Sequence, residues 1–315
     1  MTKIKGSNFL ITGGAGFIGS HLAEKLLSEK GNVVILDDFS NGSMDNLEEI
    51  KKEVKIIKID VSSPLQKIKR ALGGHNFDGI FHLACFPRSL SLKDPFRDME
   101  VNAKGTINIL EIAKDKKAKV VFTSNSGIYG DPEYLPIDEK HPNKPSTPYD
   151  ANKLVSEYYM KIYNQIFNVP IAICRLAAVY GERQRVKPGW KPLIPEFVNK
   201  VSKGKSPVIC WDGNQTRDFI YVKDVVSGLT RAFLGNTKDE IILGTGIETS
   251  VREAYNLVCK YLMKDIKPGK SDKTPGDIRR MQLSYNKAKK VIGFKPEYKI
   301  EQGIKNYIDW YKSKK

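Results

Sequence analysis

Tyr149 and Lys153 are the two residues whose types and spacing best suit acid–base chemistry. They lie four positions apart, so in a helix their side chains share one face. A free tyrosine has a pKa of about 10 and is a poor base at neutral pH, but a nearby positive charge favours its phenolate. The pair therefore predicts a phenol that exchanges a proton with a substrate hydroxyl, with its pKa lowered by the ammonium group. The spacing is common on helix surfaces, so this hypothesis depends on the elements that position the pair.

A glycine-rich turn near the N-terminus supplies that context. The apolar run 9–11 leads into three glycines spaced G-x-x-G-x-x-G, and a helical pattern follows. Glycines at a strand-to-helix turn permit a tight bend, the approach of a pyrophosphate and close packing of the helix on the strand. The free N–H groups at the start of the helix would bind the phosphates. The turn predicts a dinucleotide site that contains Gly13, Gly16, Phe17, Ile18 and Gly19.

Acidic residues at the ends of the next two strand-like runs specify the dinucleotide. Asp37 and Asp38 follow the glycines by about twenty residues, where a carboxylate accepts hydrogen bonds from the adenosine ribose and repels a 2′-phosphate. Asp60 and Val61 end the following run and would edge the adenine pocket. Because the segment 38–42 contains no arginine, we expect NAD rather than NADP. Its positively charged nicotinamide would lower the pKa of Tyr149 further.

The order of elements predicts an α/β protein. Strand patterns alternate with helical ones through the first half of the chain, which is typical of a Rossmann-type doubly wound parallel sheet. We expect an NAD-binding domain over 1–180 and a smaller mixed α/β substrate-binding region over 181–315. One segment near 216–245 is expected to return to the large sheet. The expected strands are 8–12, 33–36, 54–60, 79–83, 119–123 and 171–176, and the expected helices are 64–71, 95–114, 148–167 and 193–203.

Composition narrows the class of protein. The 52 basic and 36 acidic residues give a net charge of +16, but the lysines are spread along the chain. A solvated surface therefore explains the charge better than nucleic-acid binding. No apolar run approaches the length of a membrane span, and no signal-peptide core is present, so we expect a cytoplasmic protein. The four scattered cysteines lack metal-ligand spacing and predict thiols, with neither a metal site nor disulfides; they are Cys85, Cys174, Cys210 and Cys259.

Together these motifs resemble those of extended short-chain dehydrogenases/reductases. The closer resemblance is to the nucleotide-sugar epimerase/dehydratase branch of that family, and in particular to UDP-glucose 4-epimerase-like members. It extends from about residue 5 to residue 310. The motifs that carry it are the glycine turn, Asp37, Asp60, Tyr149 and Lys153, together with residues 82–85, 101–106, 124–132, 175–181, 213–222, 224 and 275–277.

The resemblance implies a role for each matching residue. Tyr149 would be the acid–base catalyst, and Lys153 would also hold the nicotinamide ribose. Asn102 would organise the helix beside the cofactor, whose wall would include Leu83, Ala84 and Cys85. Arg217 would bind the diphosphate of the substrate rather than form a surface ion pair with Asp218. The remaining implied substrate contacts are Arg88 and Ser89 on the sugar side, Met281 near the 2-substituent of the sugar, and a lid over 190–197.

Departures from the family pattern bear on the reaction. The family places a hydroxyl four residues before Tyr129, where this chain has Asn125; Ser124 or Ser126 could replace it, and Asn125 could orient the substrate oxygen. Dehydratases of the family use an Asp–Glu pair in this turn and decarboxylases use a Glu, whereas residues 125–127 contain no carboxylate. Ala178 and Thr274 also replace residues that contact the substrate in the family, and Lys273 lies beside Thr274.

The chemistry that remains is 4-epimerisation of a nucleotide sugar. We expect oxidation at C4, rotation of the 4-keto sugar and reduction on its other face, with recycled NAD and a UDP-hexose such as UDP-glucose or UDP-galactose. The resemblance also implies a homodimer through the helices near 95–114 and 148–167. The alternatives are another nucleotide-sugar oxidoreductase, dehydratase or epimerase, and a non-catalytic dinucleotide- or RNA-binding relative.

Overall fold

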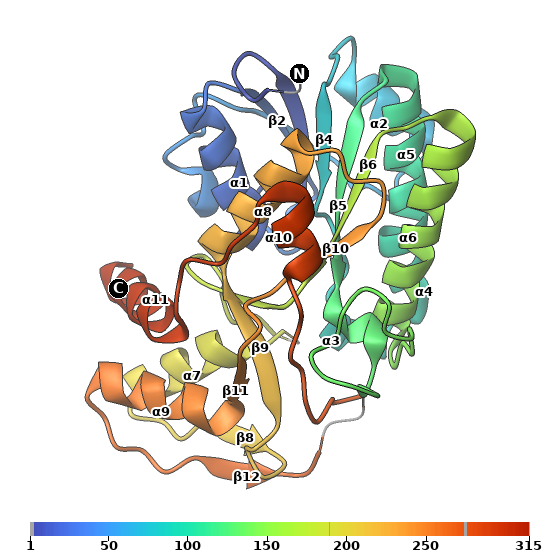
Figure 1. Ribbon diagram of the computed structural model, residues 1–315. Coiled ribbons are helices and arrows are strands. Elements are labelled where there is room, and N and C mark those ends of the chain that lie inside the picture. Colours follow the sequence, from blue (N-terminus) through green and yellow to red (C-terminus); the bar gives the residue numbers. More distant parts are fainter. Residues whose placement is uncertain (1–2, 189, 274–275, 315) are drawn as a thin grey trace.

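A large parallel sheet with helices on both faces dominates the molecule (Figure 1). This computed structural model describes residues 3–188, 190–273 and 276–314. The strand order is β10-β6-β5-β4-β1-β2-β3, and every neighbouring pair is parallel. The order in which strands are added to the sheet therefore reverses between β1 and β4, and doubly wound sheets bind their ligands at such a point. The strands are β1 (Asn8–Thr12), β2 (Asn32–Asp37), β3 (Lys55–Lys58), β4 (Gly79–His82), β5 (Lys119–Asn125), β6 (Ile171–Leu176) and β10 (Glu240–Leu243).

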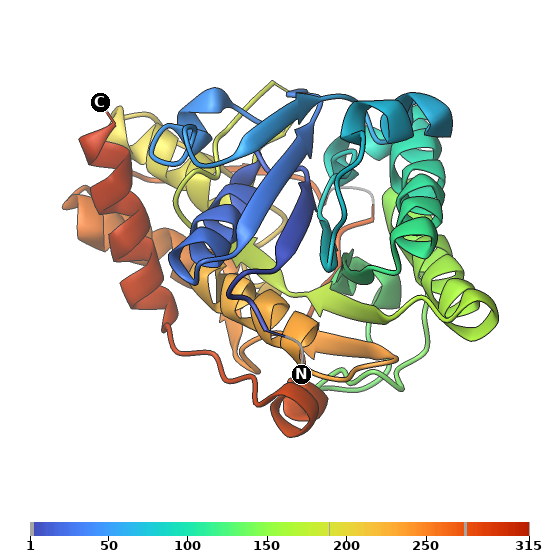
Figure 2. The ribbon, with the colours of Figure 1, turned by 90° about the horizontal axis from the view of Figure 1, so that it is seen from above.

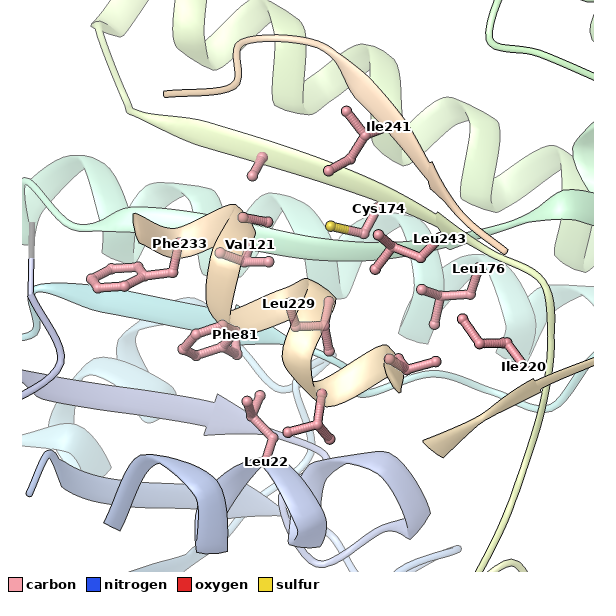
Figure 3. Packing of buried hydrophobic residues seen from close by; sticks show 14 of the residues in the cluster. Leu22, Phe81, Val121, Cys174, Leu176, Ile220, Leu229, Phe233, Ile241 and Leu243 are labelled. Carbon is pink, nitrogen blue, oxygen red and sulfur yellow. The ribbon is translucent and has the colours of Figure 1, made fainter. Parts of the chain in front are cut away.

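Two helical layers bury the two faces of the sheet (Figure 2). Successive residues of a strand point to opposite faces, so Phe81 packs toward α1 and α8 while Ile80 packs toward α2 and α5. Figure 3 shows the first of these cores, in which Leu22 of α1 and Leu229 of α8 face the sheet. The helices on that face are α1 (Phe17–Ser28), α8 (Val222–Leu234) and α10 (Asn286–Ile292), and those on the other are α2 (Leu65–Leu72), α5 (Gly105–Lys116) and α6 (Pro148–Phe167).

A smaller region with its own core extends from one end of the sheet (Figure 1). It contains the three-stranded sheet β11-β9-β7 and the two-stranded sheet β12-β8. Within 216–245, β9 lies in this region, whereas β10 lies at the edge of the large sheet with Ile241 opposite Cys174. Its elements are β7 (Ala178–Tyr180), α7 (Leu193–Ser202), β8 (Val208–Cys210), β9 (Thr216–Tyr221), β11 (Glu248–Ser250), α9 (Val251–Leu262), β12 (Gly269–Ser271) and α11 (Ile300–Ser313).

The helix expected over 95–114 is interrupted. The chain forms α4 (Pro95–Asp98), a π turn η2 (Met99–Lys104) and then α5. Within the π turn, the carbonyl oxygen of Asn102 accepts hydrogen bonds from Thr106 Oγ1 at 2.6 Å and from Ser156 Oγ at 2.8 Å. These hydroxyls take up a carbonyl that a regular helix would use internally, and π turns are frequent at functional sites. The other short elements are η1 (Met44–Leu47), α3 (Arg88–Ser91) and η3 (Ser126–Tyr129).

Candidate dinucleotide and substrate pocket

A cavity of about 400 Å³ lies at the carboxyl ends of the central strands. Its wall contains the three glycines of the first turn at one end and Tyr149 and Lys153 at the other. The ends of β2 and β3 contribute Asp37 and Asp60. Most of the residues expected at a cofactor site therefore line a single cavity. They are Gly13, Gly16, Phe17, Ile18, Gly19, Asp37, Asp38, Asp60, Val61, Leu83, Ala84, Cys85, Tyr149 and Lys153.

The first turn leaves no room for side chains at its outer glycines. Gly13 has φ +70°, and a Cβ there would lie 2.8 Å from the main-chain nitrogen of Ala84. A Cβ on Gly19 would lie 2.3 Å from the carbonyl oxygen of Gly13. Since main-chain atoms limit both positions, only glycine allows α1 to start this close to β1. The first N–H groups of α1 thus open onto the cavity, as phosphate binding requires.

The acidic end of the cavity is organised by main-chain donors. Asp37 is 5% exposed and accepts hydrogen bonds from the N–H groups of Ala15 at 2.9 Å and Phe39 at 2.8 Å. Burial raises the pKa of Asp37, although these donors oppose the change. Asp60 forms an ion pair with Arg97, which also lines the cavity and which the sequence did not indicate. A carboxylate fixed by main-chain donors, as that of Asp37 is, suits hydrogen bonding to the ribose hydroxyls of a dinucleotide.

Tyr149 and Lys153 lie on the cavity side of α6. Thr147 caps this helix by accepting a hydrogen bond from the N–H of Asp150 at 3.3 Å. Lys153 Nζ donates to the carbonyl oxygen of Thr123 at 2.9 Å and lies 5.8 Å from the centre of the Tyr149 ring. The predicted side-by-side arrangement of phenol and ammonium is therefore present. Both residues line the cavity.

The electrostatic direction at Tyr149 differs from the sequence-based expectation. Burial raises the pKa of Tyr149 well above its usual value, and Cys85, Asp150 and Asp98 raise it further. Burial also lowers the pKa of Lys153. In the protein alone the phenol is therefore protonated. In the protein alone, the predicted lowering of the Tyr149 pKa by Lys153 is therefore not found, and the effect of a nicotinamide charge stays a prediction.

The three residues that could replace the missing family hydroxyl differ in their position relative to the cavity. Ser124 lines the cavity, is 3% exposed, and its Oγ has no hydrogen-bond partner among the described residues. Asn125 also lines the cavity, but its Nδ2 donates to Asp150 Oδ1 at 2.8 Å. Ser126 is not on the cavity wall. Of the two serines, only Ser124 is therefore on the cavity wall.

Asp150 is fully buried, and both oxygens of its carboxylate already accept hydrogen bonds from neighbouring side chains. It accepts hydrogen bonds from Thr147 Oγ1 at 2.7 Å and from Arg88, whose Nε and Nη2 lie 3.0–3.1 Å from its oxygens. A Cβ on Gly127 would lie 2.3 Å from Asp150 Oδ1. An acidic side chain at position 127 would therefore clash with this carboxylate.

The sequence is similar to those of other proteins over almost its whole length. The chain matches the family described as GDP-mannose 4,6 dehydratase over residues 10–307. It is 38% identical over 309 residues to a putative UDP-glucose 4-epimerase of Methanocaldococcus jannaschii, covering 96% of this chain and 98% of the relative. It is 33% identical over 304 residues to UDP-glucuronic acid decarboxylase 6 of Arabidopsis thaliana, covering 94% and 86%. The chain belongs to the nucleotide-sugar epimerase/dehydratase family of extended short-chain dehydrogenases/reductases.

The cofactor of this family fits the cavity. A UDP-glucose 4-epimerase of Thermus thermophilus, solved in complex with NAD, superposes with a TM-score of 0.89 at 30% identity, covering 97% of this chain and 99% of that one. Members of the epimerase/dehydratase family are NAD-dependent. In this chain the glycine turn, Asp37 and Lys153 would hold NAD, and Ala84 and Cys85 would lie along it. The chain is therefore an enzyme of the nucleotide-sugar epimerase/dehydratase family.

Five of the individual residues implied by the resemblance lie off the cavity wall, and of the expected lid over 190–197 only Trp190 lines it. Asn102 acts through Phe86, a wall residue whose N–H donates to Asn102 Oδ1 at 3.1 Å. Arg217 pairs with Asp277 rather than with Asp218, and its Nη1 donates to the carbonyl oxygens of Thr216 and Ile278 at 2.7 Å. Thr274 and Pro275 lie outside the described residues. The other residues off the wall are Ser89, which is exposed, Met281, which is 3% exposed in the core, and Ser126.

A basic strap, defined here as residues 182–188, leads from β7 toward the cavity wall at Trp190. Its Arg183 pairs with Glu24 of α1, and its Arg185 pairs with Asp45 of η1 at 2.9 Å. Its Lys187 Nζ donates to the carbonyl oxygen of Asn41 at 2.6 Å. The sequence did not indicate these contacts, because they join residues more than one hundred positions apart. The strap ties the smaller region to the edge of the NAD-binding part.

The described residues lack both a membrane-spanning helix and a cluster of metal ligands. The described residues contain no helix that is long and apolar enough to cross a bilayer. The same residues contain no group of three or more His, Cys, Asp or Glu side chains placed to bind a metal ion.

Proposed function

We propose that this enzyme is an NAD-dependent nucleotide-sugar 4-epimerase that acts on a UDP-hexose of the UDP-glucose/UDP-galactose type. The observation that carries the proposal is the state of the carboxylates around Tyr149. Among the described wall residues the only acids are Asp37, Asp38 and Asp60, which lie at the other end of the cavity. No free carboxylate on the described wall beside Tyr149 is available to remove a second proton or to assist elimination.

The packing of Gly127 supports this interpretation. Asp150 occupies the space into which an acidic side chain at 127 would extend, and its own oxygens are taken by Arg88, Thr147 and Asn125. Charge-assisted hydrogen bonds from a guanidinium group, together with bonds from two further donors, hold this carboxylate in place. Dehydration and decarboxylation within the family use a carboxylate from this turn, so the geometry favours the reaction that needs none.

The chain's own residues would divide the work as follows. Bound NAD would supply the hydride acceptor and donor for C4 of the sugar. Tyr149 exchanges the proton of the C4 hydroxyl, while Lys153 holds the nicotinamide ribose and favours the phenolate. Ser124 donates a hydrogen bond to the same oxygen and stabilises it as its charge changes. The apolar side chains of the cavity wall would limit the access of water during the exchange.

The substrate contacts remain part of the proposal. Arg217 would bind the diphosphate, which must then displace the carboxylate of Asp277 from its guanidinium group. Arg88 and Ser89 would face the sugar, with Asn125 oriented by Asp150. Met281 lies in the core, so it would affect the sugar only indirectly, through the position of Thr216, whose Oγ1 accepts a hydrogen bond from the Met281 N–H at 3.3 Å.

The relatives support a UDP-sugar substrate without fixing the reaction, since they include epimerases and a decarboxylase. The decisive experiment incubates the purified holoenzyme, with no NAD added, with UDP-glucose, UDP-galactose, UDP-N-acetylglucosamine and UDP-glucuronate in turn. We expect NMR to show interconversion of C4 epimers. A pentose product with release of carbon dioxide would identify a decarboxylase, and a 4-keto-6-deoxy sugar would identify a dehydratase; either result overturns the proposal.

We also propose that the enzyme is a homodimer through α4 and α6. The outward face of α6 exposes apolar side chains at helical spacing, with Tyr158 58% and Ile166 63% exposed, and Phe96 of α4 is 78% exposed. Such a patch on a helix pair is typical of an interface. Light scattering should give twice the mass of the 35.5 kDa chain, and Ile166→Lys should give the monomer. A monomeric wild-type protein would contradict this proposal.

A further inference from the structure

Asp98 is a buried acid that the proposed reaction does not use. It is the last residue of α4, it is fully buried, and it is not on the wall of the active-site cavity. α4 packs against both the π turn η2 and α6. Burial raises the pKa of Asp98, although hydrogen bonds from two asparagines and the charge of Lys153 oppose the change. A buried carboxylate destabilises a protein unless its partners compensate, so the partners of Asp98 are a guide to its role.

Both oxygens of Asp98 accept a hydrogen bond from an asparagine side chain. Oδ1 accepts from Asn102 Nδ2 at 2.7 Å, and Oδ2 accepts from Asn152 Nδ2 at 2.6 Å. The orientation of the Asn102 amide is fixed independently, because its Oδ1 accepts from the main-chain N–H of Phe86 at 3.1 Å. Since that oxygen faces an N–H donor, the amide nitrogen faces Asp98. The carboxylate thus bridges two amides on different elements.

Asn152 places one end of this bridge on the helix that carries Tyr149 and Lys153. It lies three residues after the tyrosine and directly before the lysine, so on α6 it borders the face that they share. One turn further on, Ser156 Oγ donates to the carbonyl oxygen of Asn102 at 2.8 Å. Both contacts join α6 to the π turn. They fix the rotation of α6 about its axis, and the direction of the Tyr149 side chain depends on that rotation.

Asn102 places the other end of the bridge on the facing wall of the cavity. Its amide holds the main chain of Phe86, because Nδ2 also donates to the Phe86 carbonyl oxygen at 3.4 Å. Phe86 follows Cys85, and both line the cavity. The side chain of Cys85 in turn hydrogen-bonds with that of Tyr149. Through one asparagine each, Asp98 therefore connects the two segments that meet at the Tyr149 hydroxyl.

We propose that Asp98 is a positioning residue of the active site: its carboxylate ties α6 to the π turn and so holds the Tyr149 hydroxyl in place. This inference rests on the proposed role of Tyr149. A phenol that exchanges a proton must stay within hydrogen-bonding distance of the C4 hydroxyl, and a misplacement of about 1 Å can lower the rate about 10²-fold. Loss of the bridge should therefore lower kcat more than it weakens the binding of NAD or of the sugar.

Asp98→Asn opens the bridge at one end. The asparagine keeps one acceptor oxygen but turns an N–H group toward one of its two amide partners, so one hydrogen bond is lost. We expect kcat to fall about 10–10²-fold, while KM for the sugar and the NAD content of the purified protein stay within about twofold of the wild type. The substrate is the UDP-sugar that the wild type converts in the panel. A kcat within about twofold of the wild-type value would overturn the proposal.

A crystal structure of the Asp98→Asn holoenzyme gives a second measurement, which does not depend on the reaction. The Tyr149 hydroxyl should lie about 1 Å from its wild-type position relative to Cys85, and an unchanged position would overturn the proposal. Conversion of the sugar to a pentose or to a 4-keto-6-deoxy product would instead end the epimerase proposal. The displacement of Tyr149 would still test the role of Asp98 in that case.

An exchange of the two side chains tests whether the hydrogen bonds carry the effect. In the double variant Asp98→Asn with Asn152→Asp, the amide and the carboxylate change places, so every donor again faces an acceptor. The urea midpoint should fall in each single variant and return toward the wild-type value in the double variant. The kcat of the double variant should recover to within about threefold of the wild type. A double variant no more active than Asp98→Asn would overturn the proposal.

Asp224→Asn is the matched control. Asp224 is 2% exposed, lies off the cavity wall, and accepts hydrogen bonds from the main-chain N–H groups of Glu297 at 2.9 Å and Tyr298 at 3.1 Å. Its substitution alters a buried carboxylate with two donors, as Asp98→Asn does, and should lower the urea midpoint while kcat stays within about twofold of the wild type. An equal loss of kcat in this variant would assign the effect to general destabilisation and overturn the proposal.

Discussion

Replacing Ser124 by alanine should change activity and stability in opposite directions. In the protein alone this side chain is buried and its Oγ lacks a partner among the described residues, so the hydroxyl contributes nothing to offset the loss of hydration. An unpaired buried hydroxyl destabilises the folded state by about 1–3 kcal/mol, and Ser124→Ala removes that cost. In the reaction, however, the hydroxyl would be one of two donors to the substrate oxygen.

The magnitudes follow from these two roles. Unfolding 315 residues has an entropy of about 0.7 kcal/mol per kelvin, so 1–3 kcal/mol raises the Tm by about 1.5–4 °C. Loss of one positioned donor to a developing charge lowers kcat about 10²–10³-fold. A variant that is more stable and far less active would show that the hydroxyl is kept for chemistry.

The assay pairs Ser124→Ala with Ser126→Ala. Ser126 lies off the cavity wall, so its loss should leave kcat unchanged and the free energy of unfolding within about 0.5 kcal/mol. Thermal unfolding followed by tryptophan fluorescence and the rate of UDP-galactose conversion measure the two effects. Normal turnover by Ser124→Ala, or a fall in its Tm, would refute the reasoning.

Four other perturbations have defined outcomes. Tyr149→Phe should keep NAD in the purified protein, seen by its release on denaturation, but lower kcat about 10²–10⁴-fold; near-normal turnover would remove the tyrosine from the mechanism. Gly19→Ala places a Cβ 2.3 Å from a main-chain oxygen, so the purified variant should lack NAD, and full occupancy would contradict the close approach. Glu157→Gln leaves Arg175, which is 1% exposed, with only the more distant carboxylate of Glu240 at 3.8 Å and should cost about 3–5 kcal/mol in a urea titration, whereas a cost below about 1 kcal/mol would mean that the pair with Glu157 is not desolvated. Folding lowers the pKa of His21 from 6.5 to about 4, so the unfolded chain binds a proton at this imidazole at higher pH than the folded protein does. The free energy of unfolding should therefore fall as the pH drops from 6.5 through 4. His21→Gln should reduce that fall, and an unchanged pH dependence would assign the fall to other groups.

The sequence predicted best where local patterns and a resemblance agree. The bounds of α6, Pro148–Phe167, match the expected helix 148–167, because Thr147 and Pro148 start the helix and a clear apolar face continues it. The glycine spacing located the turn, since its constraints involve only neighbouring main-chain atoms. Tyr149 and Lys153 share a face of one helix, so their geometry followed from their spacing.

Long-range contacts explain the differences. The π turn at 99–104 depends on Ser156, a residue of another helix, so helical periodicity alone could not indicate it. The choice between Ser124 and Ser126 required the direction of each side chain at the end of β5, and the partner of Arg217 required the return of the segment at Asp277. The pKa of Tyr149 depends on burial, which no spacing rule reports.

The basic strap has a consequence for how the cofactor leaves. Arg183, Arg185 and Lys187 hold the strap to the NAD-binding part mainly through contacts between opposite charges at or near the surface. Dissolved ions screen the attraction between exposed charges, with a Debye length of about 10 Å at 0.1 M salt that becomes shorter as the salt concentration rises. We therefore expect the rate at which bound NAD exchanges with free NAD to increase with ionic strength, even where the equilibrium fit of the dinucleotide is unchanged.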